Sequence, residues 1–138
     1  ECVYYGNLVN SNGSIRHSGD EREGHQNIEG SGDDERIDVN LDYVPPSVRA
    51  LYFILTMASP GKNFADVDSA FAHIYNLTEG ESIGRFIPHL VGGHTALFLV
   101  RFSRNTTYHG WNVSIIGETD PSARDFGSLI PEIKSYSR

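Results

Sequence analysis

The sequence has one cysteine, two lysines and no long apolar run. Cys2 alone cannot form an internal disulfide or a cysteine-rich zinc site, so the fold must rest on apolar packing. With only Lys62 and Lys134 as lysines and a net charge of −7, the chain lacks the clustered cations of a nucleic-acid-binding protein. No segment approaches the roughly 20 apolar residues of a membrane helix, and no signal-peptide pattern is present. We therefore expect a soluble protein with no nucleic-acid partner and no transmembrane segment.

Half of the acidic side chains fall in one short part of the chain. Of 18 Asp and Glu residues, 9 lie between residues 20 and 42, where only Arg22 and Arg36 oppose them. Residues 18–35 contain almost nothing apolar besides Ile28 and include several glycines, so they predict a loop that adds nothing to a core. A loop of this length in a compact domain is usually functional or disordered.

Short strand patterns follow this loop. The apolar and polar alternation of Ile37–Leu41 predicts a half-buried strand that Pro45 ends. Residues 48–57 are apolar on both faces, which favours a central strand. Further short strands are expected at 70–75, 83–87, 95–102 and 111–116, the last two forming an antiparallel hairpin through the polar connector 104–110.

The C-terminal segment departs from the strand pattern. Asp120 before Pro121 is typical of an N-cap followed by proline at the first helical position, and Phe126 and Ile130 recur at helical spacing. We expect a short helix that ends near Pro131. About six strands and one terminal helix predict a mainly all-β fold, an antiparallel β-sandwich with a short C-terminal helix.

The acidic loop has the composition of a calcium site. Calcium takes about six to eight oxygen ligands, and glycines let backbone carbonyls turn toward the ion. Three consecutive carboxylates, Asp33, Asp34 and Glu35, repel one another unless a divalent cation lies among them. The spacing does not fit an EF-hand. The alternative is an acidic face that is simply solvated.

Two segments that flank and enter this loop carry a recognisable motif. They are residues 12–20 (NGSIRHSGD) and 29–41 (EGSGDDERIDVNL). They resemble the tellurium-resistance TerD-like family, whose motif runs approximately D-G-S-V-x-H-S-G-D-N-x-T-G-x-G-x-G-D-D-E-x-I-x-V-x-L. The resemblance covers most of the chain in order, continuing through Val44–Pro45, 48–57, Asn63–Phe64, Ala70–Phe71 and 123–127.

The resemblance implies one TerD-like domain over residues 1–138, a calcium-binding β-sandwich associated with bacterial stress and tellurite resistance. It implies no established enzymatic activity. The family's pattern also has an upstream strand segment resembling F-D-L-D-A-S, which adds acidic residues to the site, and the printed sequence starts after that position. Glu21 stands where the family has Asn, and residues 25–28 look like an insertion. The metal-ligand candidates, matched by position or adjacent to the matched residues, are Asp20, Glu21, Asp33, Asp34 and Glu35.

Other patterns point to no catalytic site. The six histidines show no paired metal spacing, and His25, inside the acidic loop, is the strongest candidate for an extra ligand. No G-x-S-x-G motif accompanies His89 and His94, so we expect no enzyme. We expect a cytoplasmic protein, although four N-glycosylation sequons leave secretion open; they begin at Asn12, Asn76, Asn105 and Asn112.

Two functional hypotheses follow from these features. In the first, calcium orders the acidic loop and presents a surface to a protein partner in a stress response. In the second, the domain is a metal-independent interaction or scaffold module whose calcium loop is degenerate.

Overall fold

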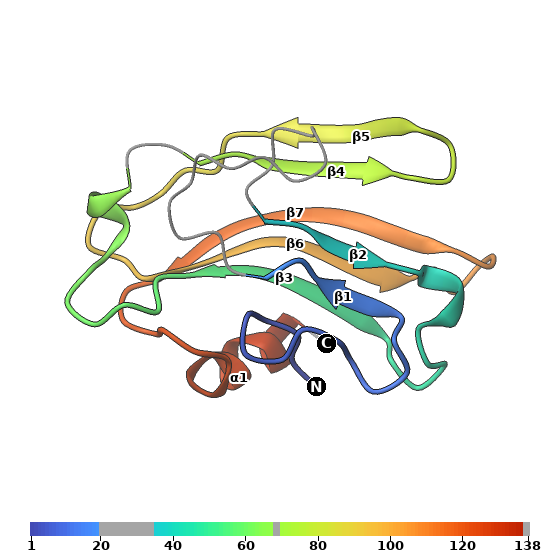
Figure 1. Ribbon diagram of the computed structural model, residues 1–138, viewed down its shortest axis with the longest axis horizontal. Coiled ribbons are helices and arrows are strands. Elements are labelled where there is room, and N and C mark those ends of the chain that lie inside the picture. Colours follow the sequence, from blue (N-terminus) through green and yellow to red (C-terminus); the bar gives the residue numbers. More distant parts are fainter. Residues whose placement is uncertain (20–34, 68–69, 137–138) are drawn as a thin grey trace. The chain divides into compact units, whose positions relative to one another are not determined.

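The computed structural model describes residues 1–19, 35–67 and 70–136 (Figure 1). The chain divides into two compact units, Glu1–Val48 and Arg49–Arg138. Each unit has its own hydrogen-bonded strands.

A short antiparallel ladder organises the first unit. Strands β1 (Ile15–His17) and β2 (Ile37–Val39) pair so that Ile15 faces Val39 and His17 faces Ile37. The 3-10 helix η1 (Leu41–Tyr43) follows β2. A small polar cluster supports β1, because the buried Asn10 side chain accepts from the Ile15 amide at 3.0 Å and donates to the Ser14 hydroxyl at 2.8 Å.

The second unit contains a three-stranded sheet in the order β3-β6-β7, with both pairs antiparallel. Its strands are β3 (Ala50–Thr56), β6 (Ala96–Arg104) and β7 (Trp111–Asp120). A separate antiparallel hairpin consists of β4 (Ala72–Asn76) and β5 (Glu81–Phe86), and the 3-10 helix η2 (Phe64–Asp66) precedes it.

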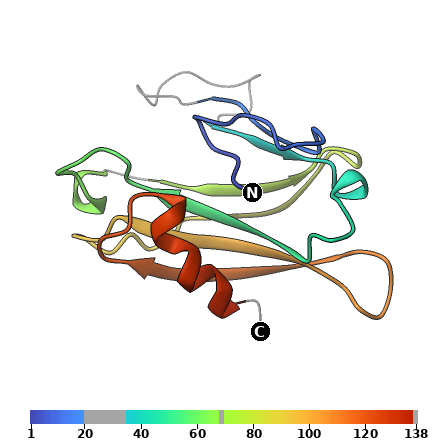
Figure 2. The ribbon, with the colours of Figure 1, turned by 90° about the horizontal axis from the view of Figure 1, so that it is seen from below.

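Helix α1 (Phe126–Tyr136) packs on one face of this sheet (Figure 2). The buried centre is formed by Ala96, Phe98, Ala123 and Leu129. Around it lie the partly buried side chains Ile54, Ile116, Ile133 and Tyr136. Within residues 1–19, 35–67 and 70–136, no helix is both long and apolar enough to cross a membrane.

The expected mainly all-β class is confirmed, with antiparallel sheets of the kind that form a sandwich and a short C-terminal helix. The predicted hairpin is also confirmed, since β6 and β7 pair antiparallel across the polar connector. The expected central position of the 48–57 strand is wrong, because β6 lies between β3 and β7. The reason is burial: β6 contains the consecutive buried residues Ala96–Phe98, whereas every side chain of β3 is only partly buried.

The expected helix bounds are also wrong. Asp120 ends β7, and its carboxylate accepts from the amides of Ser122 and Ala123 in a turn that precedes the helix. The cap is Asp125, which accepts from the Ser128 amide at 2.8 Å. The helix also continues through Pro131, because the side chains beyond it still reach the apolar core.

Truncating the core residue of α1 should destabilise the second unit. Leu129→Ala removes a side chain that is 1% exposed, so we expect the free energy of unfolding to fall by about 3 kcal/mol. The control is Leu77→Ala, because Leu77 is 65% exposed and its loss should cost no more than about 0.5 kcal/mol. Urea unfolding measures both; equal losses would contradict the assigned core.

Candidate functional site

Most of the predicted metal ligands lie outside the described residues. Asp20, Glu21, Asp33 and Asp34 belong to the stretch 20–34, as does His25. Glu35 is the one predicted ligand that the structure describes, and it lies two residues before β2. Two chain segments, ending at Gly19 and beginning at Glu35, flank residues 20–34.

The structure brings those two ends together. Beyond the β1-β2 ladder, the Ser18 amide donates to the Arg36 carbonyl at 2.8 Å. The Arg36 amide in turn donates to the Ser18 hydroxyl, also at 2.8 Å. These two bonds hold the residues before and after the acidic stretch side by side. A preformed base of this kind lowers the entropy that a ligand must overcome to order the loop between its ends.

His17 lies at this base with a defined orientation. Its Nδ1 accepts a hydrogen bond from the Gly19 amide at 2.9 Å, so the ring proton of the neutral form is on Nε2. Nε2 lies 3.9 Å from Oε2 of Glu35. The His17 side chain is 8% exposed and that of Glu35 is 45% exposed. The buried imidazole thus presents a donor to a carboxylate that still reaches solvent.

Arg36 is one of the few cations in the acidic region, and it contacts an acid of β2. Its Nε lies 3.1 Å from Oδ1 of Asp38, and its terminal nitrogen donates to Oδ2 of the same carboxylate at 3.2 Å. This two-point contact balances the charge of Asp38 on the strand.

The described residues do not form a metal centre by themselves. Among them, no group of three or more His, Cys, Asp or Glu side chains is arranged to hold a metal ion. Glu35 is nevertheless a suitable calcium donor, since it is a carboxylate, partly exposed and located at the closed base of the loop. A calcium site here requires ligands from residues 20–34 in addition to Glu35.

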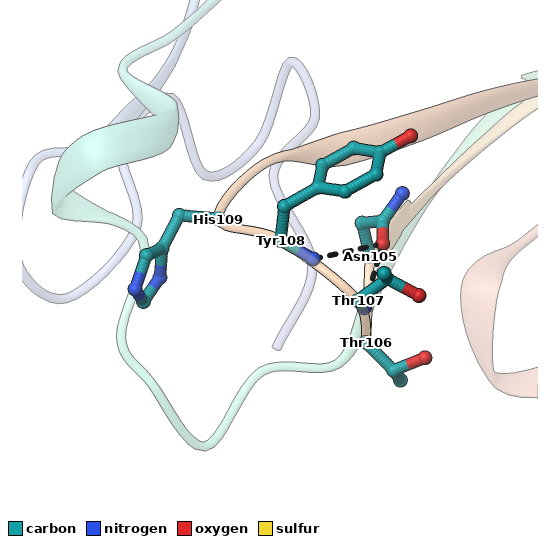
Figure 3. A pocket seen from close by; sticks show the side chains of 5 residues that line it. All are labelled: Asn105, Thr106, Thr107, Tyr108 and His109. Carbon is teal, nitrogen blue, oxygen red and sulfur yellow. Dashed lines mark hydrogen bonds between the residues drawn. The ribbon is translucent and has the colours of Figure 1, made fainter.

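The tip of the β6-β7 hairpin forms a shallow hollow of about 220 Å³ (Figure 3). Asn105 shapes it, because its side-chain oxygen Oδ1 accepts from the amides of Thr107 at 2.8 Å and Tyr108 at 3.3 Å. Figure 3 shows the ring of His109 directed away from the other side chains that line the hollow. This arrangement stabilises a turn and brings no nucleophile and base together.

Two histidines of the second unit have hydroxyl partners. His73 on β4 is 2.9 Å from the Ser82 hydroxyl of β5, and His94 is 2.7 Å from the Thr119 hydroxyl of β7. Both contacts link neighbouring strand segments. They give these histidines structural roles within the second unit.

Sequence analysis missed a carboxyl pair where α1 meets β7. Glu132 of the helix is hydrogen-bonded to Asp120 at the end of the strand. This bond, with some burial and the nearby negative charges, raises the pKa of Glu132 to about 7. The same bond, together with the amides of the adjoining turn, lowers the pKa of Asp120. No local sequence pattern could have found this pair, since its members meet only through tertiary packing.

A family model and several curated relatives all point to the same family. The family model described as the TerD domain matches residues 1–123. Tellurium resistance protein TerZ of Serratia marcescens is 32% identical over 117 residues, which cover 85% of this chain and 56% of TerZ. Tellurium resistance protein TerD of the same organism is 34% identical over 89 residues, covering 62% of this chain and 44% of that protein.

A stress protein matches over the same number of residues as TerD does. General stress protein 16U of Bacillus subtilis is 36% identical over 89 residues, covering 62% of this chain and 44% of its own length. The chain spans about half the length of these curated relatives.

Removing the His17 ring should weaken the base of the acidic loop. His17→Ala leaves the Gly19 amide without its acceptor and empties a nearly buried position, so we expect a loss of about 1 to 2 kcal/mol in unfolding free energy. His109→Ala at the hairpin tip is the matched control and should change stability by less than about 0.5 kcal/mol. Thermal and urea unfolding measure both, and a His17→Ala protein as stable as the control would refute this role.

Proposed function

Because the chain belongs to the TerD domain family, we propose that it is a non-enzymatic calcium-binding module that takes part in stress or tellurium resistance. The names of its relatives describe resistance and stress proteins, and this part of the proposal rests on them. The calcium part rests on the residues of the acidic loop.

One structural observation carries the calcium proposal: the two ends of the acidic stretch are held together. The paired hydrogen bonds between Ser18 and Arg36 close the base, and Glu35 lies beside them. Carboxylates that lie close together between these two ends repel one another unless a cation offsets their charge. The ligands that we propose are Asp20, Glu21, Asp33, Asp34 and Glu35.

Calcium fits this donor set better than a transition metal does. The candidate residues supply carboxylate oxygens, and glycine-rich backbone supplies carbonyls, both of which are ligands that calcium prefers. The nearest described imidazole, His17, has its Nδ1 occupied by the Gly19 amide and directs Nε2 toward Glu35. It therefore acts as support for a ligand.

Calcium would act here by making the acidic loop both less negative and more ordered. An ion held in the loop neutralises part of the acidic region and stabilises the folded state by mass action. A protein that recognises the ordered, less negative loop would then bind in a calcium-dependent way. The protein partner and the cytoplasmic location expected from the sequence stay predictions.

The contact between His17 and Glu35 favours a second candidate function. It gives Glu35 a polar neighbour without any metal, as a metal-independent interaction or scaffold module would require. The two functions differ in one property, which is whether the thermal midpoint of the protein responds to calcium.

Calorimetric titration of the metal-stripped chain with calcium distinguishes them. We expect binding in the micromolar range, a higher thermal midpoint, and an affinity at least about tenfold lower when Asp33→Asn and Asp34→Asn are combined. Magnesium serves as the competing ion. Glu79→Gln, an exposed carboxylate of the β4-β5 turn, is the control and should bind as the unmodified protein does.

Either of two results would contradict the calcium proposal. No heat and no shift in midpoint would favour the metal-independent module. Unchanged affinity in the double variant would mean that calcium binds elsewhere.

A further inference from the structure

Two side-chain bridges join helix α1 to strand β7. Glu118 and Asp120 lie two residues apart on β7 and share a face of the strand. Glu132 and Tyr136 lie four residues apart on α1 and share a face of the helix. The Tyr136 hydroxyl donates to the Glu118 carboxylate, and Glu132 is hydrogen-bonded to Asp120. The last two turns of the helix are thus attached to one strand by acids.

The bridge between Glu132 and Asp120 requires a proton, because two ionised carboxylates cannot hydrogen-bond to each other. The proton belongs to Glu132. Oδ1 of Asp120 already accepts from the amides of Ser122 at 2.9 Å and Ala123 at 2.7 Å, which favours the ionised form of Asp120. Glu132 is then the donor and Asp120 the acceptor.

Nearby negative charges favour the protonated form of Glu132. Glu118 and Asp120 of β7 both face Glu132 with negative charge. Among residues 1–19, 35–67 and 70–136, no lysine or arginine forms an ion pair with any of these three acids. When Glu132 ionises, three negative charges therefore meet, and no lysine or arginine of the described residues pairs with them.

The remaining titratable and charged groups around this crossing come from three elements. Tyr136 on α1 lies near both Glu118 and Glu132. Tyr52 of β3 faces Tyr136, with ring centres 6.1 Å apart, and Arg101 of β6 lies over the Tyr52 ring at 5.7 Å. His94, just before β6, acts on Asp120, and Lys134 of α1 is exposed.

Pro131 weakens the link between the two halves of α1, so the second half is the part that can separate from the sheet. Proline has no amide hydrogen, so the helical hydrogen bond to the Gly127 carbonyl is absent at this point. The first half stays attached through Leu129, which is almost fully buried. The second half relies on Ile133, on Tyr136 and on the acid bridges.

We propose that residues 131–136 form a proton-dependent clasp: protonated Glu132 holds this half of the helix on β7, and loss of the proton makes its release from the sheet more frequent. Release uncovers the side of the core where the rings of Tyr136 and Phe98 meet, with centres 5.3 Å apart. The clasp thereby links pH to exposure of apolar surface in the second unit.

The direction of the pH effect follows from the pKa of Glu132. Attachment to Asp120 raises this pKa from 4.5 to about 7, so the docked helix binds a proton more tightly than the released helix does. The stabilisation is fully present below pH 4.5 and is lost as the pH rises toward about 7. Because the pair is partly exposed to solvent, we expect release to become only about tenfold more frequent over this window.

Amide hydrogen exchange followed by NMR between pH 4.5 and 8, corrected for intrinsic exchange rates, tests the clasp. We expect protection of residues 133–136 to fall about tenfold while the amides of β6 stay unchanged. In Glu132→Gln the side-chain amide still donates to Asp120 and carries no charge, so protection should not depend on pH. Glu79→Gln, distant in sequence and exposed, should retain the full pH response.

Constant protection in the unmodified protein, or an unchanged pH response in Glu132→Gln, would overturn the clasp. Carbon-13 titration of the Glu132 carboxyl in the unmodified protein gives a second test that does not depend on a variant. A midpoint near 7 supports the shared proton, and a midpoint near 4.5 overturns it.

Discussion

Repulsion between neighbouring carboxylates is the constraint on which both proposed sites of this protein depend. The chain carries 18 acids against 11 lysines and arginines, and half of those acids fall between residues 20 and 42. At the base of the loop the fold brings the flanking residues together through Ser18 and Arg36. At the C-terminal end it brings Asp120 and Glu132 into contact. A bound cation or a retained proton relieves a concentration of like charge of this kind, as solvent does where the side chains are exposed.

We propose that the two sites relieve this repulsion in different ways because their surroundings differ. The acidic loop is rich in glycine and carboxylate oxygens, which suits a divalent cation. The pair at α1 lies beside the apolar cluster around Phe98 and Leu129, where a single proton shared between two acids suffices. The metal hypothesis and the clasp therefore follow from one physical cause, but they can be tested independently.

Much of the fold was predictable from apolar patterning. Continuous apolar runs located β3 and β6, and the polar connector between residues 104 and 110 located the hairpin. Sequence could not rank the two runs by burial, since both are rich in the same residue types, and it therefore placed the wrong strand at the centre. The helix start was misplaced for a similar reason. Asp120 and Asp125 both suit a cap, and only the packing of Leu129 and Ile133 selects Asp125.

The sites were predictable to different degrees. The acidic stretch and Glu35 follow directly from composition and from the family motif. The orientation of His17 depends on a bond to the Gly19 amide, and the Asp120–Glu132 pair depends on helix docking, so neither has a local signal.

The measurement that tests the calcium proposal most directly is an NMR titration of the metal-stripped chain with calcium, read at the amides of His17, Gly19, Glu35 and Arg36. We predict saturable shifts at these four positions with no comparable shifts in β6; the absence of shifts at the base of the loop at saturating calcium would contradict the account.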